Sequence, residues 1–88
     1  MASIKILFFA AARDAVGSPE EIIHLDNLPE NLTKNCTSEV LKEFVTEKFS
    51  LHDIGPFLLS LNEEYLEENE ICLNDGDVIG VIPPISGG

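Results

Sequence analysis

The stretch VIGVIPP, residues 78–84, holds the strongest structural signal in this chain of 88 residues. Its first five residues form a near-continuous apolar run, which is typical of a central strand buried on both faces. The turn signal NDGD at residues 74–77 comes directly before the run. Pro83 and Pro84 end it, because proline cannot donate to a ladder and favours an extended backbone. We therefore expect a central strand at residues 78–82 and an extended segment after it.

The N-terminal segment predicts a second strand at residues 3–10. Ile4, Ile6 and Phe8 alternate there with Lys5, Leu7 and Phe9, so the two sets lie on opposite faces. Lys5 is costly to bury, so its face should point toward solvent. Leu7 and Phe9 share that outer face, and either another part of the fold or a partner must cover them.

Amphipathic periodicity predicts one main helix, over Ser38–Phe49. Thr37 or Ser38 can cap its first turn, and an apolar stripe recurs at helical spacing. The residues of this stripe are Leu41, Phe44, Val45 and Phe49. A short helical turn is expected at residues 11–16, and a strand at 20–25 should form a hairpin with the first strand. Residues 26–37 look like a polar loop.

The remaining segments predict a strand at 57–61, a turn at 62–64 and a short edge strand that begins at Tyr65 and Leu66. Acidic residues from 63 to 70 are most simply a solvated edge. One helix across one mixed sheet satisfies the two-layer rule of the α+β class. If the first and last strands pair in the middle, the arrangement is a ubiquitin-like β-grasp. We expect one domain at residues 1–82 and an extended tail at 83–88.

Charge and composition exclude several functional classes. Sixteen acidic residues against five basic ones give a net charge of −11, and residues 49–88 hold eight acids and no base. Such a surface repels phosphate backbones, so no nucleic-acid partner is expected. It favours a basic protein partner, although solubility alone explains the charge equally well. No apolar run is long enough to span a membrane and no leader is evident, so a cytoplasmic location is the default.

No side-chain constellation for catalysis or metal binding is evident. His24 and His52 have no spaced partners, and residues 74–77 lack the glutamate of a calcium loop. Cys36 is expected in a polar loop, and Cys72 alternates with its neighbours as a strand residue would. Two cysteines so far apart predict neither a disulfide scaffold nor a metal cluster, so no metal is expected.

The C-terminus offers a different kind of chemistry. A tail that ends in Gly87 and Gly88 can enter a channel too narrow for any Cβ. It also presents the terminal carboxylate as its leading group. An ionised carboxylate is a poor electrophile, so a partner enzyme would have to activate it, for example as an acyl-adenylate. From the glycines alone, a frayed tail is the simpler interpretation.

Both ends of the chain resemble one family. The ending NDGDVIGVIPPISGG, residues 74–88, and the start ILFFA, residues 6–10, followed by Arg13 and Gly17, are similar to the small subunit of molybdopterin synthase. That resemblance implies a β-grasp sulfur carrier. An E1-like enzyme would use ATP to adenylate Gly88 and convert it to a thiocarboxylate. This sulfur would then be supplied to cyclic pyranopterin monophosphate in the large subunit, to form the dithiolene of molybdopterin.

The resemblance also implies the residues that make contact. Two small subunits would bind a dimer of large subunits, and the inserted tail would comprise Pro83, Pro84, Ile85, Ser86 and Gly87 ahead of Gly88. The family's apolar docking surface maps to Phe9, Tyr65 and Ile82. Arg13 also matches a family position, where it would contact a partner or pair locally with an acid such as Asp14. No bound cofactor is implied.

Two other functions remain open. The chain could be a related carrier or modifier that serves thiamine synthesis or tRNA thiolation, or that forms isopeptide links to lysines. It could also be a ubiquitin-like binding module with a passive tail. The Pro-Pro-x-Ser-Gly-Gly ending favours the synthase subunit.

Overall fold

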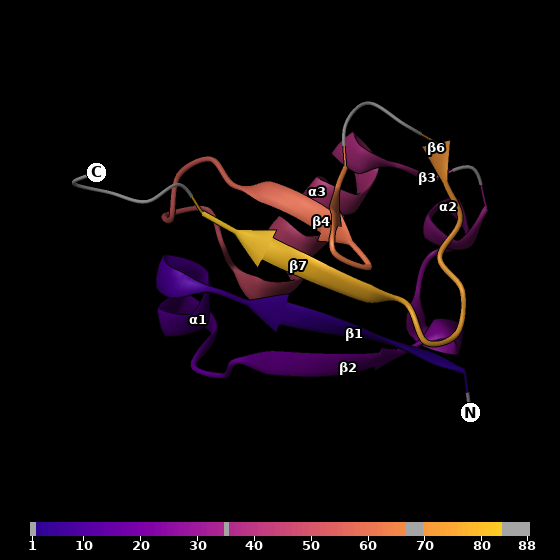
Figure 1. The fold of residues 1–88 in the computed structure, drawn as a ribbon, viewed down its shortest axis with the longest axis horizontal. Helices are drawn as coiled ribbons and strands as arrows, with labels where there is room; N and C mark the ends of the chain where they lie inside the picture. Colours follow the sequence, from indigo (N-terminus) through magenta and orange to yellow (C-terminus); the bar gives the residue numbers. More distant parts are fainter. Residues whose placement is uncertain (1, 35, 67–69, 84–88) are drawn as a thin grey trace.

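A five-stranded mixed sheet forms the centre of the computed structural model, which describes residues 2–34, 36–66 and 70–83 (Figure 1). The strand order is β2-β1-β7-β4-β5, and β3 and β6 form a separate two-stranded sheet. The elements in chain order are β1 (Ser3–Phe8), α1 (Ala10–Val16), β2 (Glu20–His24), a 3-10 helix (Leu25–Asn27), α2 (Glu30–Thr33), β3 (Cys36–Thr37), α3 (Ser38–Phe49), β4 (Leu58–Leu61), β5 (Glu64–Tyr65), β6 (Glu70–Ile71) and β7 (Val78–Ile82).

The first and last strands pair in the middle of the sheet, as the sequence predicted. β1 and β7 run parallel, with Leu7 opposite Gly80, and β2 and β4 flank them antiparallel. Parallel strands present their carboxyl ends at the same edge. The end of β1, the helix α1 and the start of the C-terminal tail therefore lie at one end of the sheet (Figure 1). This arrangement confirms the β-grasp prediction.

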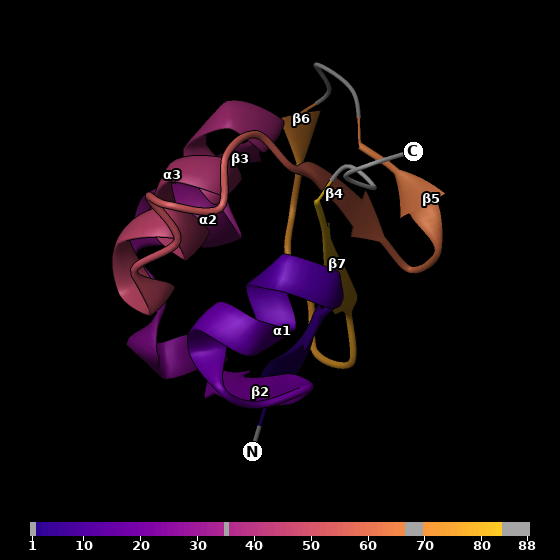
Figure 2. The same cartoon turned by 90° about the vertical axis from the view of Figure 1, so that its left-hand side faces the viewer.

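The helix α3 covers one face of the sheet. Its bounds match the prediction, and the Thr37 side chain caps it by accepting a hydrogen bond from the Val40 N–H at 3.3 Å. Leu41 and Val45 are fully buried against the sheet residues Ile6 and Ile79. Among the described elements, no helix covers the opposite face, as the view along the sheet shows (Figure 2). We call that opposite face the open face.

The expected burial of residues 78–82 on both sides holds only in part. Ile79 and Val81 are fully buried toward α3. On the open face Gly80 is buried, but Val78 and Ile82 are only half-buried. The strand at the N-terminus is also shorter than expected, because α1 begins at Ala10.

The expectation of a polar loop at residues 26–37 was wrong. This segment holds the 3-10 helix, α2 and β3, and it buries Leu28 and Leu32 in the core. Cys36 is fully buried in β3, where it pairs with Ile71 of β6. The sequence did not predict α2 because this helix has only four residues, most of them polar, and shows no apolar periodicity. The prediction for Cys72 was also wrong, because this residue follows β6 and is exposed.

The two cysteines should differ in reactivity. Burial raises the pKa of the Cys36 thiol, and the proximity of Cys72 raises it further. We expect a chromogenic thiol reagent to label Cys72 in the native protein, and Cys36 at least about a hundredfold more slowly, because a buried thiol reacts only when the structure opens. The Cys72→Ser variant should lose only the fast phase of labelling, which belongs to the exposed thiol. Equal rates at both thiols would contradict the buried position of Cys36.

Candidate functional site

Four large apolar side chains are exposed in the described structure, and all four lie on the open face. The exposed fractions are 46% for Phe9, 58% for Ile22, 55% for Leu58 and 65% for Tyr65. Strand register places Leu58 opposite Ile82 and Tyr65 opposite Ser60. Ile22 lies apart from them, opposite Lys5 on the edge strand β2. Phe9 and Tyr65 are the two of these four side chains that line one hollow of the open face, and contiguous apolar exposure is typical of interaction surfaces.

A pocket of about 270 Å³ lies near the middle of the open face. Its lining comes from β1, β7, β4, β5 and the turn between the last two: Leu7, Phe9, Ser60, Glu63, Tyr65, Val78, Gly80 and Ile82. A Cβ at Gly80 would collide with the Ser60 hydroxyl and lie 3.5 Å from the Phe9 ring. The absence of a side chain at Gly80 therefore lets the Phe9 ring lie close to β7.

Phe9 is fixed at the junction of β1 and α1. Its N–H donates to the Val81 carbonyl at 3.2 Å, which continues the β1–β7 pairing by one residue. Its own carbonyl accepts from the Ala12 N–H at 3.0 Å, in the first turn of α1. Both contacts hold the backbone so that the ring projects onto the open face, as the alternation in β1 predicted.

The structure brings three of the expected interface residues together. Phe9, Tyr65 and Ile82 all line the same pocket. Arg13 lies apart from them on α1, where it is exposed, and it forms no ion pair with a described acid. Its partner contact therefore stays a prediction.

The tail begins at the edge of this pocket. Pro83 directly follows β7 and is buried. Pro84, Ile85, Ser86, Gly87 and Gly88 lie outside the described residues, so their expected roles stay predictions. Because Ile82 both lines the pocket and ends β7, the pocket and the start of the tail are joined by one strand.

Sequence reasoning missed part of this site. Leu58 could have been found, since alternation with the buried Leu59 assigns it to the open face. Gly80 and Ser60 become part of the site only through the pairing of β7 with β4. Glu63 is exposed, as the prediction of a solvated edge requires, but its place in the lining of the pocket was not predicted.

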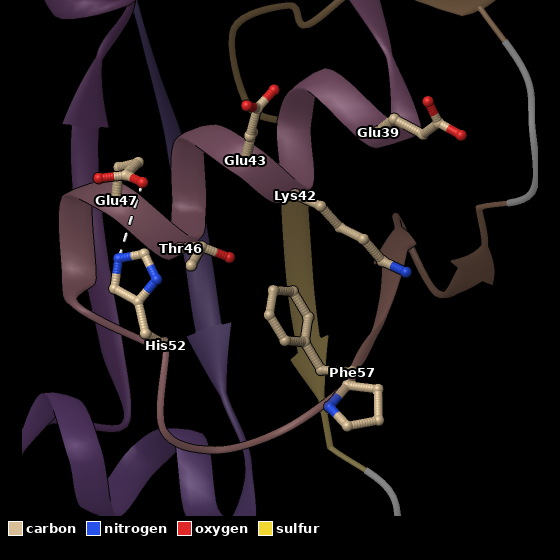
Figure 3. A pocket seen from close by; sticks show the side chains of 8 residues that line it. Glu39, Lys42, Glu43, Thr46, Glu47, His52 and Phe57 are labelled. Atoms are coloured by element: carbon tan, nitrogen blue, oxygen red, sulfur yellow. Dashed lines mark ion pairs between the residues drawn. The ribbon is translucent and has the colours of Figure 1, made fainter.

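A wider hollow of about 490 Å³ lies on the helix layer. Its walls are mostly long polar side chains of α3, and Phe57 lies beneath Lys42, whose Nζ is 5.9 Å from the ring centroid (Figure 3). His52 pairs with Glu47 at 3.6 Å. The hollow contains no nucleophile with an adjacent base, so it offers no catalytic arrangement.

Metal-binding and membrane-spanning features are absent from the described part of the chain. No group of three His, Cys, Asp or Glu side chains there is placed to hold a metal ion. In residues 74–77 the Asp77 carboxylate accepts from the Asn74 N–H at 2.8 Å, as in an ordinary turn. None of the described helices has the length and apolar character needed to cross a bilayer.

Comparison with known proteins gives a family. A family model described as the ThiS family matches residues 6–88. An Arabidopsis thaliana protein named "Molybdopterin synthase sulfur carrier subunit" is 35% identical, with 97% of this chain and 82% of the relative covered. The solution structure of small archaeal modifier protein 1 from Methanosarcina acetivorans is 26% identical and superposes with a TM-score of 0.63, with 100% of this chain and 98% of that chain covered.

A second solved structure shares the fold. It is the complex of subunits 1 and 2 of molybdopterin-converting factor from Helicobacter pylori, with a TM-score of 0.61 at 23% identity, and 98% of this chain and 99% of the matched chain are covered. The matched family model spans almost the whole sequence, and the curated relative matches along nearly all of it. The chain therefore belongs to the ThiS family of ubiquitin-like β-grasp proteins.

Proposed function

We propose that this chain is the sulfur-carrier small subunit of molybdopterin synthase. The observation that carries the proposal is that Phe9, Tyr65 and Ile82 line one pocket, and that Ile82 ends the strand that leads into the Gly-Gly tail. The name of the Arabidopsis relative and its match over nearly the whole chain support the same function. In this proposal the domain docks through its open face, and the tail reaches the active site of the large subunit.

The terminal carboxylate of Gly88 is the reacting group. An E1-like enzyme joins it to the α-phosphate of ATP and releases pyrophosphate, which gives an acyl-adenylate. Sulfide then attacks the acyl carbon, displaces AMP and leaves a thiocarboxylate. That sulfur is transferred to cyclic pyranopterin monophosphate in the large subunit, and water restores the carboxylate. The domain itself contributes binding and positioning, because its described residues hold no catalytic arrangement.

The charge of the chain supports a basic partner. The net charge is −11, and no lysine or arginine follows Lys48. A large subunit that binds a phosphate-bearing substrate needs a basic surface near the tail. Complementary charge would accelerate association at low salt. Two small subunits per dimer of large subunits is the assembly that the family resemblance implies.

Intact-mass spectrometry tests the proposal. After co-expression with its activating enzyme and a sulfur source, a fraction of the protein should be heavier by the replacement of one oxygen with sulfur. The added sulfur should map to Gly88 in a C-terminal peptide, and a variant without the last two glycines should show no such species. Unmodified mass alone under these conditions would contradict any carrier function.

A protein modifier is the second candidate, and the likeness to the Methanosarcina modifier protein favours it. A modifier would form isopeptide bonds from Gly88 to lysines. A pull-down separates the two functions, since a carrier recovers the large subunit as a non-covalent complex. A modifier instead gives higher-mass conjugates that survive denaturation.

A further inference from the structure

The turn between β4 and β5 has an unusual residue at its second position. Asn62 and Glu63 both have positive φ, of 50° and 74°, so they form the two-residue hairpin turn that strongly prefers Asn followed by Gly. Asn62 fits this preference. Glu63 does not, because a side chain with a Cβ is strained in the left-handed region.

Asn62 fixes the turn against β7 and prevents it from relaxing. Its side-chain amide donates to Asp77 Oδ1 at 3.1 Å, and its Oδ1 accepts from the Val78 N–H at 2.9 Å. Its backbone N–H also donates to the Val78 carbonyl at 2.8 Å. Glu63 is therefore held at a fixed point on the rim of the open-face pocket.

Glu63 is also the one charged residue among the eight that line this pocket. The rest of the lining is apolar, apart from the Ser60 hydroxyl and the phenol of Tyr65. In the described structure the acids that take part in ion pairs are Glu20, Glu30 and Glu47. The Glu63 carboxylate thus has no basic partner among the described residues.

We propose that Glu63 binds a lysine or arginine side chain of the protein that docks on the open face. The aliphatic stem of that side chain would lie in the pocket against Tyr65 and Ile82, and its charged end would meet the Glu63 carboxylate. Strain retained at an exposed turn points to a binding role rather than a folding role. The partner is the large synthase subunit, so this inference rests on the proposed function.

The test compares two neighbouring acids. Calorimetric titration with the purified large subunit should show that Glu63→Gln weakens binding about three- to tenfold at low salt, and that the difference shrinks as salt rises. Glu64→Gln is the matched control. It removes the same charge one residue away, at a side chain that does not line the pocket, and it should change the affinity less than twofold.

A second variant separates binding from folding. Glu63→Gly relieves the positive-φ strain, so its melting temperature should rise by roughly 2–6 °C. Its affinity should nevertheless fall as far as that of Glu63→Gln. A more stable protein that binds less tightly is the result expected of a residue retained for its partner.

Three outcomes would overturn the inference. If the unaltered chain binds and Tyr65→Ala weakens it while Glu63→Gln does not, the docking surface stands but Glu63 has no role in it. If the unaltered chain does not bind at all, the proposed function itself fails. If the chain alone forms a dimer that Glu63→Gln dissociates, the pocket belongs to a second copy rather than to the large subunit.

Discussion

One alanine added after Gly88 is expected to lower sulfur transfer by at least about a hundredfold and to leave the melting temperature unchanged. The extra residue moves the terminal carboxylate by roughly 3.3–3.6 Å along the tail. In the proposed function it would also bring a Cβ into a channel that is too narrow for any side chain. Reacting atoms must approach to about 3–3.5 Å, and even a 1 Å displacement costs on the order of a hundredfold in rate.

Reconstitution with the activating enzyme, a sulfur source and the large subunit measures this effect through the yield of molybdopterin. The matched control is one alanine added before Met1. Because β1 and β7 are parallel, β1 starts at the end of the sheet opposite the one where β7 leads into the tail (Figure 1), so this variant should retain full activity. Normal activity in the C-terminally extended chain would show that the terminal acyl group is not the reacting group.

The periodic elements of this fold could be predicted from the sequence. Alternation assigned Ile6 and Phe8 to the core and Phe9 to the open face, because a strand has a period of two. The helix Ser38–Phe49 combines helical spacing with a capping threonine, so both its existence and its bounds were visible. These signals are local, and the tertiary structure did not override them.

The missed elements depend on contacts between distant segments. β3 contains only two residues, and it exists because it pairs with β6 more than thirty residues later. The pocket likewise requires the register of four strands, which brings Gly80 beside Leu7 and Ser60. The strain at Glu63 arises from a turn geometry that alternation along the chain does not show. Local periodicity contains none of this information.

Substitutions at the adjacent residues Phe8 and Phe9 should separate the effect on stability from the effect on partner binding. Phe8 is only 2% exposed, and its ring packs edge-on against Phe49 with centroids 4.9 Å apart. Phe8→Ala should therefore cost about 3–5 kcal/mol of stability, a large share of the roughly 5–15 kcal/mol that holds such a domain together. Its melting temperature should fall by more than about 10 °C.

Phe9→Ala should have the opposite profile. Its half-exposed ring lies on the open face, so the loss of stability should stay below about 1 kcal/mol. An aromatic anchor at the centre of an interface contributes about 2 kcal/mol or more, so affinity for the large subunit should fall roughly thirtyfold. Calorimetric titration and thermal melting on both variants measure the two effects.

The two variants remove the same phenyl group from neighbouring positions, so composition and hydrophobicity cannot explain a difference between them. Binding of Phe8→Ala must be scored per folded molecule, at a temperature where circular dichroism shows the native state. If Phe9→Ala unfolds the domain and leaves the affinity per folded molecule unchanged, Phe9 is a core residue. The open face would then lose its central anchor, and docking would have to use another surface.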